Sequence, residues 1–178
     1  MDGALWVFGY GSLIWDPGFP VAERRLARAR GWRRGFCMRS IHHRGTPEAP
    51  GLVLALDRDA QAYCDGVAFR VTGGAEQATL AALRERELIS SAYLEEWVDI
   101  ETAAGGLRAL VYVIDPVHVQ YCGGLPAEEQ AQIIARATGG RGPNADYLFA
   151  TVAHLDDLGI ADADLAALAA RVRQLRRM

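Results

Sequence analysis

The sequence predicts an α+β fold. Short runs of β-branched and other apolar residues recur through the first two-thirds of the chain, and three of four helical patterns lie in the last third. These segments do not alternate as regular β–α–β units, which argues against a parallel α/β sheet. The length of 178 residues suits one domain, residues 1–178, with a single substantial core.

Six segments have the composition of β-strands, and turn-prone residues separate several of them. The first is a short apolar run that reads as a buried strand. In chain order the expected strands are Leu5–Phe8, Gly35–Arg39, Leu52–Leu56, Gly66–Val71, Trp97–Glu101 and Arg108–Ile114.

Four segments repeat their apolar residues with the period of an α-helix. Pro126 stands near the start of the second segment, where a first-turn proline is tolerated. Asn144 directly precedes the third and is a plausible N-cap. The expected helices are Glu76–Ile89, Ala127–Ala137, Ala145–Asp157 and Asp164–Leu175.

Bulk properties predict a water-soluble cytoplasmic protein. Hydrophobic residues make up 51% of the chain, and no apolar run approaches the roughly 20 residues that span a bilayer. Met1-Asp2-Gly3 has no basic region of the kind that opens a signal peptide. Cys37, Cys64 and Cys122 form no Cys-x-x-Cys pair, so free thiols in a reducing compartment are expected.

The basic residues are all arginines, and eight of the 19 lie between Arg24 and Arg44 with no acid among them. Trp32 and Phe36 fall in the same stretch, so a nucleic-acid patch has to be considered. Apolar residues interrupt the arginines, and the net charge is −3, so a solvated face is favoured and no nucleic-acid partner is expected. Some of these arginines could instead line a pocket for an anionic substrate.

The loop after the first strand is the strongest local signal. The apolar run Leu5–Phe8 leads directly into Gly9-Tyr10-Gly11-Ser12. Two glycines allow a sharp turn and a close approach of the backbone to a ligand. Such a loop can direct several N–H groups at one oxygen. Gly-x-Gly alone also fits an ordinary turn.

The full string Phe8-Gly-Tyr-Gly-Ser-Leu-Ile-Trp15 resembles the signature loop of the γ-glutamylcyclotransferases, above all of the ChaC branch, which acts on glutathione. The chain departs from the pattern at Phe69 (usually Tyr), Leu88 (usually Met) and Ser90-Ser91 (usually glycine). Further similar blocks follow in family order: His43–Pro47, Gly66–Arg70, Arg86–Tyr93, Asp115–His118 with Tyr121, and Gly142–Leu148.

This resemblance implies a small, closed or nearly closed β-barrel flanked by helices, with the ligand cavity at its mouth. It also implies a monomer that acts on a small molecule, glutathione, without a metal or organic cofactor and without a membrane partner. In the implied reaction the α-amine of a γ-glutamyl amide attacks the γ-carbonyl, which yields 5-oxoproline and a free amine, Cys-Gly for glutathione.

Glu87 is the candidate proton carrier. On a helix, Leu80, Leu83 and Glu87 fall within about 60° of one another, whereas Glu85 lies about 140° from Leu80. Glu87 should therefore point inward. Periodicity leaves open whether it is a structural ion pair, with Arg84 close by, or a functional acid. The resemblance implies the second, because its Arg-Glu-Met-Ile pattern has its catalytic glutamate at this position.

The resemblance also implies the substrate contacts. Backbone N–H groups of Gly11, Ser12 and Leu13 would hold γ-glutamyl oxygens. Tyr10 and Tyr147 are the expected side-chain contacts. Ser40 and Arg44 are further candidates that a purely structural role would explain equally well.

Other kinds of site fit less well. The histidines and cysteines lack metal-ligand spacing, so no metal site is expected. Ser12 is not in a Gly-x-Ser-x-Gly elbow. The stretch 139–142 lacks the Lys-Ser/Thr of a P-loop and reads as a flexible loop. Two alternatives to the glutathione enzyme stay open: an enzyme for another γ-glutamyl amine, and a non-catalytic γ-glutamyl-binding module.

Overall fold

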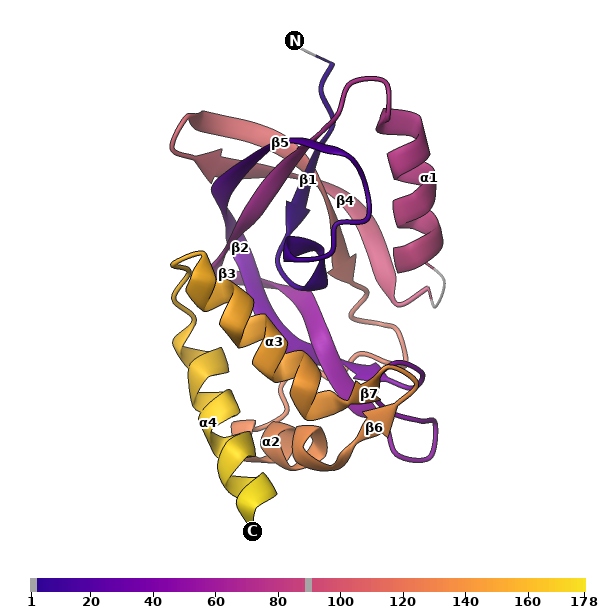
Figure 1. Cartoon of the computed structure of the whole chain (residues 1–178), viewed down its shortest axis with the longest axis vertical. Coiled ribbons are helices and arrows are strands. Elements are labelled where there is room, and N and C mark those ends of the chain that lie inside the picture. The colour runs from indigo at the N-terminus through magenta and orange to yellow at the C-terminus, as the bar shows by residue number, and fades with distance from the viewer. Residues whose placement is uncertain (1–2, 89–90) are drawn as a thin grey trace. The chain divides into compact units, whose positions relative to one another are not determined.

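Two long antiparallel strands, β2 (Val21–Ser40) and β3 (Gly51–Val71), run through most of the first half of the chain (Figure 1). The computed structural model describes residues 3–88 and 91–178. These residues form two compact units, and β2 and β3 contribute to both. Unit 1 comprises Met1–Arg34 and Leu56–His118, and unit 2 comprises Gly35–Ala55 and Val119–Met178. The prediction of one domain over residues 1–178 stays a prediction.

Unit 1 contains a closed barrel with the strand order β1-β3-β2-β4-β5. The short strand β1 (Trp6–Gly9) pairs antiparallel with β3 and parallel with β5, opposite Leu110. Strands β4 (Tyr93–Thr102) and β5 (Gly105–Ile114) form an antiparallel hairpin. With helix α1 (Glu76–Glu87) in the same unit, the barrel confirms the predicted α+β class.

The interior of unit 1 joins three parts of the chain that are distant in sequence. Leu13 from the loop after β1, Leu83 from α1 and Tyr112 from β5 belong to one buried cluster. Burying such side chains stabilises a fold by about 1.5–3 kcal/mol each. Leu88, at the end of α1, packs against the same cluster. This core therefore holds the loop and the end of the helix against the same strand.

Unit 2 contains the other helices of the described chain. Helix α4 (Ala163–Arg177) packs against both α2 (Ala127–Arg136) and α3 (Asn144–Asp157). A two-stranded hairpin, β6 (Thr138–Gly139) with β7 (Gly142–Pro143), precedes α3, so the stretch predicted as a flexible loop is folded. Its Gly140 and Arg141 N–H groups donate to the carbonyls of His42 and His43.

Asn144 is not the N-cap of α3, which corrects the prediction. Pro143 holds the cap position, and Asn144 is the first residue of the helix. Its side chain is fully buried and accepts from the N–H of Leu52 and donates to the carbonyl of the same residue, both at 2.8 Å. The Asn144 amide therefore continues the hydrogen bonding of β3 as a neighbouring strand would.

The strand boundaries differ most from the prediction in the arginine-rich region. The expected strand Gly35–Arg39 is the end of the much longer β2, and Leu52–Leu56 and Gly66–Val71 are the two ends of β3. Most arginines of β2 are exposed or half-buried and alternate with buried residues, so a count of consecutive apolar residues does not detect the strand. Helix α1 ends at Glu87, and the expected end at Ile89 lies outside the described residues.

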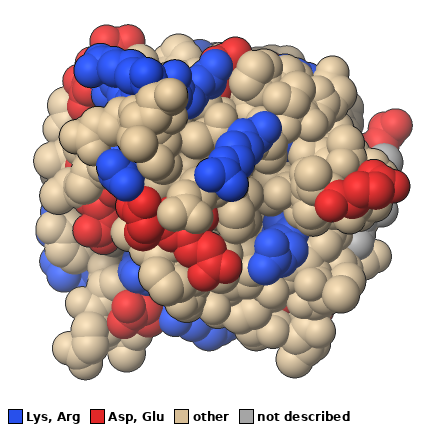
Figure 2. Space-filling view, turned by 90° about the horizontal axis from the view of Figure 1, so that it is seen from below, with Lys and Arg blue, Asp and Glu red and all other residues tan. Residues whose placement is uncertain are grey.

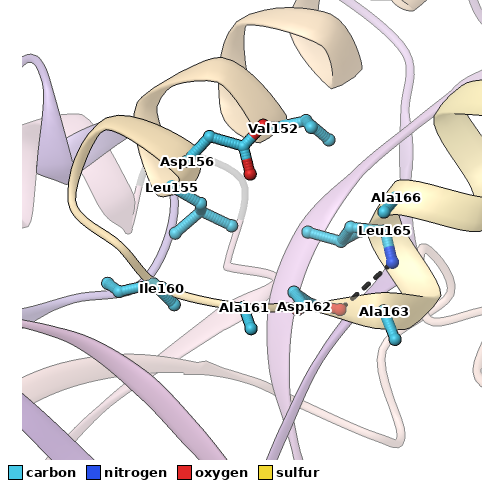
Figure 3. A pocket seen from close by; sticks show the side chains of 9 residues that line it. All are labelled: Val152, Leu155, Asp156, Ile160, Ala161, Asp162, Ala163, Leu165 and Ala166. Atoms are coloured by element: carbon cyan, nitrogen blue, oxygen red, sulfur yellow. Dashed lines mark hydrogen bonds between the residues drawn. The ribbon is translucent and has the colours of Figure 1, made fainter.

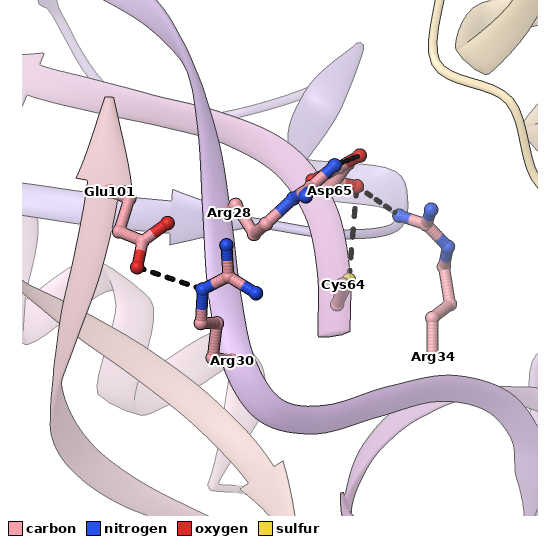
Figure 4. Close-up of polar contacts among 6 residues, drawn as sticks. All are labelled: Arg28, Arg30, Arg34, Cys64, Asp65 and Glu101. Atoms are coloured by element: carbon pink, nitrogen blue, oxygen red, sulfur yellow. Dashed lines mark hydrogen bonds and ion pairs between the residues drawn. The ribbon is translucent and has the colours of Figure 1, made fainter. Parts of the chain in front are cut away.

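Many of the β2 arginines bond to neighbouring strands (Figure 4). Arg28 holds both oxygens of Asp65, at 2.7 and 3.0 Å, and Arg30 bonds to Glu101 at 2.8 Å. The buried Arg34 donates to the carbonyls of Tyr10 and Asp65. On the face shown in Figure 2, basic and acidic side chains are interspersed among uncharged ones. Arg28, Arg30 and Arg34 therefore connect β2 to neighbouring segments of the chain.

The three cysteines are free thiols, as predicted. Cys37 and Cys122 lie beside the bridge between Met38 and Tyr121, and the N–H of Cys122 donates to the Cys37 carbonyl at 2.8 Å. Within residues 3–88 and 91–178, no helix is long and apolar enough to cross a membrane.

Candidate active site

The loop after β1 forms a tight turn at the edge of the unit 1 core. A short 3-10 turn (Ser12–Ile14) begins directly after Gly11. At Gly9 a side chain would meet Phe69 at 3.0 Å and Leu13 at 3.2 Å. At Gly66 it would meet the Gly9 carbonyl oxygen at 2.3 Å. Glycine at both positions thus lets β1 and β3 approach closely and sets where the turn begins.

The turn presents a row of backbone donors. The N–H of Ile14 bonds to Gly11 O, and the N–H of Asp16 bonds to Ser12 O, both at 2.9 Å. Among the described residues, the N–H groups of Gly11, Ser12 and Leu13 make no hydrogen bond to a protein acceptor. The first N–H groups of a helical turn lack intrahelical partners and commonly bind anionic or carbonyl oxygens. The predicted oxygen-binding loop therefore has the donors that it needs.

Glu87 is the last residue of α1 and points inward, as the periodicity predicts. Its side chain is only 16% exposed, and Leu83, one turn earlier, is buried in the core. Glu85 is exposed. Burial raises the pKa of the Glu87 carboxyl, and the positive charge of Arg86 opposes that rise. A carboxyl whose pKa moves toward neutrality is suited to taking up and returning a proton.

The ion-pair partner of Glu87 is Arg86, not Arg84. Arg84 points to β4, where it holds both carboxylate oxygens of Glu95 at 2.9 Å. The Arg86 Nε lies 3.3 Å from Glu87 Oε1. Helical spacing places Arg84 nearer to Glu87 on the helix surface than an adjacent residue, so periodicity alone could not identify Arg86.

Tyr112 of β5 lies at the centre of this group and was not predicted. Its hydroxyl donates to Glu95 at 3.0 Å, and its carbonyl accepts from the Tyr10 hydroxyl at 2.6 Å. Burial, followed by the Glu95 contact, raises the pKa of the Tyr112 phenol far above its usual range. The charge of Glu87 makes a smaller contribution in the same direction. Tyr112 therefore carries a neutral hydroxyl, and it connects Tyr10 of the loop with Glu95 of β4.

The remaining predicted residues lie in unit 2 and form a group of their own. The Ser40 hydroxyl accepts from the Arg44 N–H at 3.0 Å. The Arg44 guanidinium donates to the carbonyls of Arg141 and Pro143 and lies 5.7 Å from the Tyr147 ring centre. The Tyr147 hydroxyl accepts from the Leu54 N–H at 3.2 Å. These contacts give Ser40 and Arg44 a structural role, and substrate contact by any of the three stays a prediction.

An apolar cavity of about 250 Å3 lies between the end of α3 and the start of α4 in unit 2 (Figure 3). Its walls include Val152, Leu155 and Ile160. Of its two carboxylates, Asp162 caps α4 through the Leu165 N–H and Asp156 is exposed. Neither is a desolvated acid, so the cavity lacks the proton carrier that α1 offers in unit 1.

We expect Ser12→Ala to keep measurable activity, because the turn offers backbone N–H groups and the Ser12 hydroxyl makes only a 3.3 Å contact with Arg86. Gly11→Val should instead lose substrate binding, since a branched side chain restricts the turn and crowds its donors. KM and kcat for both variants check this. Complete inactivation by Ser12→Ala with substrate binding intact would point to a nucleophilic or proton-transferring serine.

Comparisons with known proteins agree with this arrangement. The family model described as "ChaC-like protein" matches residues 5–175. An Escherichia coli protein named glutathione-specific γ-glutamylcyclotransferase is 37% identical over 175 residues, covering 98% of this chain and 75% of the relative. Arabidopsis thaliana γ-glutamylcyclotransferase 2-3 is 37% identical over 181 residues, covering 97% and 90%.

The fold is also shared with a solved structure. A crystal structure of a yeast γ-glutamyl cyclotransferase specific to glutathione superposes with a TM-score of 0.87, covering 97% of each chain at 24% identity. The family match over nearly the whole chain carries the assignment, and the shared barrel fold agrees with it. The chain belongs to the ChaC-like protein family.

Proposed function

We propose that this protein is a γ-glutamylcyclotransferase that cleaves glutathione to 5-oxoproline and Cys-Gly. The observation that carries the proposal is the largely buried carboxylate of Glu87 at the end of a helix whose Leu83 packs in the same core as Leu13 of the loop of unpaired N–H donors. Relatives from Escherichia coli and zebrafish, at 37% identity, are named for this activity. An inward acid argues for an enzyme rather than for a binding module, which would not need one.

The reaction is an internal aminolysis. Glu87 takes a proton from the substrate α-ammonium, and the freed amine attacks the γ-carbonyl carbon. The N–H groups of Gly11, Ser12 and Leu13 stabilise the oxygen that becomes negative. The γ-amide C–N bond then breaks as Glu87 gives its proton to the nitrogen of Cys-Gly. The ring nitrogen passes its second proton to Glu87, which leaves a neutral five-membered lactam, and Glu87 finally releases that proton to the free amine or to water. Holding the amine against the carbonyl supplies much of the rate, because the attack becomes effectively unimolecular.

The test is direct conversion of glutathione by the purified chain, with 5-oxoproline measured by mass spectrometry. We expect kcat/KM to be ~10- to 100-fold higher for glutathione than for γ-glutamyl-alanine. γ-Glutamyl-alanine has no terminal glycine, so it cannot make the charge-assisted contact of ~1.5–3 kcal/mol that the glycine carboxylate would make. γ-Glutamyl-cysteine differs from glutathione only in lacking the glycine, so comparing kcat/KM for these two substrates measures the contribution of the glycine. Equal values for all three would keep the chemistry and overturn glutathione as the substrate. Absence of 5-oxoproline from every substrate would favour a binding module.

The same proposal has the protein act as a cytoplasmic monomer on a small-molecule substrate. Three free thiols suit a reducing compartment. Light scattering of the purified chain measures its mass in solution. A dimer would overturn the monomer without affecting the proposed chemistry.

A further inference from the structure

One guanidinium joins the donor loop to the candidate acid. Arg86 Nη1 donates to the Asp16 carbonyl at 2.7 Å, and Nη2 donates to the Ser12 hydroxyl at 3.3 Å. These two acceptors lie at either end of the turn that follows Gly11. Its Nε lies 3.3 Å from Glu87 Oε1. Each of the three guanidinium nitrogens of Arg86 therefore contacts a different residue.

The environment of Arg86 makes these contacts effective. Its side chain is 29% exposed, compared with 53% for Arg84 on the same helix. Charge-assisted hydrogen bonds gain strength as water is excluded. Asp16 Oδ2, 4.0 Å away, is a second acid near the guanidinium and is itself well exposed. The planar fork of arginine can serve three acceptors at once, which the single ammonium of a lysine cannot reproduce.

We propose that Arg86 is the positioning residue of the active site: it fixes the Gly11–Leu13 donors relative to the Glu87 carboxylate, and its positive charge stabilises the charged form of that carboxylate. The inference rests on the proposed role of Glu87 as acid and base. Its consequence is that loop geometry and proton affinity depend on the same side chain. A substitution of Arg86 should therefore change both.

The groups around Glu87 determine the direction of the effect. Burial raises the pKa of Glu87, and Arg86 lowers it. From β5, Tyr112 presents a neutral phenol, behind which Glu95 is neutralised by Arg84. From the loop, Asp16 carries a further negative charge, which Arg86 offsets. Removing Arg86 leaves the effect of burial unopposed, so the pKa of Glu87 should rise and a higher pH should be needed to form the base.

The experiment compares Arg86→Met and Arg86→Lys with Arg108→Met as the control, because Arg108 is an exposed arginine of the same unit whose ion-pair partner, Asp99, is also exposed. We expect Arg86→Met to lower kcat/KM by ~10- to 100-fold, the loss typical of a charge-assisted contact, and to move the acidic limb of its pH profile to higher pH. Arg86→Lys should keep that limb near the wild-type position, because the charge remains, while kcat/KM still falls. Arg108→Met should change neither the acidic limb nor kcat/KM.

Direct titration separates this inference from the proposed function. Carbon-13 NMR of the glutamate carboxyl carbons, assigned with Glu87→Gln, reports the pKa of Glu87 without turnover. A wild-type protein that makes no 5-oxoproline would refute the proposed function, whether or not Arg86→Met raises this pKa. If the wild-type enzyme is active, and folded Arg86→Met has the same acidic limb and the same Glu87 pKa as the wild type, the role of Arg86 is overturned. If Arg86→Met does not fold, an unreduced kcat/KM in Arg86→Lys overturns the positioning role.

Discussion

Glu87→Gln is expected to remain folded and to lose 5-oxoproline formation almost completely. The amide keeps the size of the carboxyl but can neither accept the proton of the substrate ammonium nor return one to the leaving amine. Loss of a positioned acid–base group costs ~10²–10⁴ in rate. The measurement is kcat for glutathione, with thermal unfolding to check that the variant is folded.

Glu85→Gln is the matched control for this variant. It makes the same chemical change two residues earlier on α1, on the exposed face of the helix. We expect it to retain wild-type turnover. Near-wild-type activity in folded Glu87→Gln would refute the acid–base assignment and would direct attention to Glu85.

Among the substitutions proposed for this protein, Asn144→Leu should lower the free energy of unfolding most. The side chain is fully buried and bonds to both the N–H and the carbonyl of Leu52. Leucine has a similar volume but leaves both backbone groups buried without partners, at a cost of about 1–3 kcal/mol each. We expect the free energy of unfolding to fall by about 2–5 kcal/mol and the melting temperature by roughly 10 °C.

Asp146→Ala, two residues along the same helix, is the control. That side chain is 62% exposed, and its closest arginine, Arg176, lies 3.9 Å away. Exposed ion pairs contribute about 0–1 kcal/mol, so its melting temperature should barely change. An Asn144→Leu variant that melts with the wild type would show that water or a backbone shift satisfies Leu52.

The sequence predicted the direction of the Glu87 side chain and the turn of the donor loop better than the contacts that support them. The inward direction of Glu87 follows from helical periodicity, because the apolar stripe of Leu80 and Leu83 continues through it. The donor loop follows from its glycines. Arg86 could not be identified in this way, since adjacent helix residues point in different directions and its contact with Glu87 depends on its side-chain conformation. Tyr112 reads only as one apolar residue of a strand, because its role depends on strand pairing.

The same distinction applies to the fold. Boundaries of α2 and α3 agree with the prediction to within one residue, because their signals are local. The length of β2 was missed, since its arginines are stabilised by acids such as Asp65 and Glu101 that are far away in sequence. Asn144 was misread as a cap because its true partner, Leu52, lies in another segment.

The interleaving of the two units has a consequence for biosynthesis. Unit 1 needs Arg108–Ile114 of β5 to close its barrel, so it cannot be complete until about two-thirds of the chain has left the ribosome. In unit 2, the segment Gly35–Ala55 is synthesised early, whereas the helices that it packs with are synthesised last. Until then Leu52 and Leu54 have no helical cover, and unpaired apolar strands are prone to aggregate. A nascent chain stalled after β5 should therefore depend on chaperones, and neither unit can be expressed alone by simple truncation.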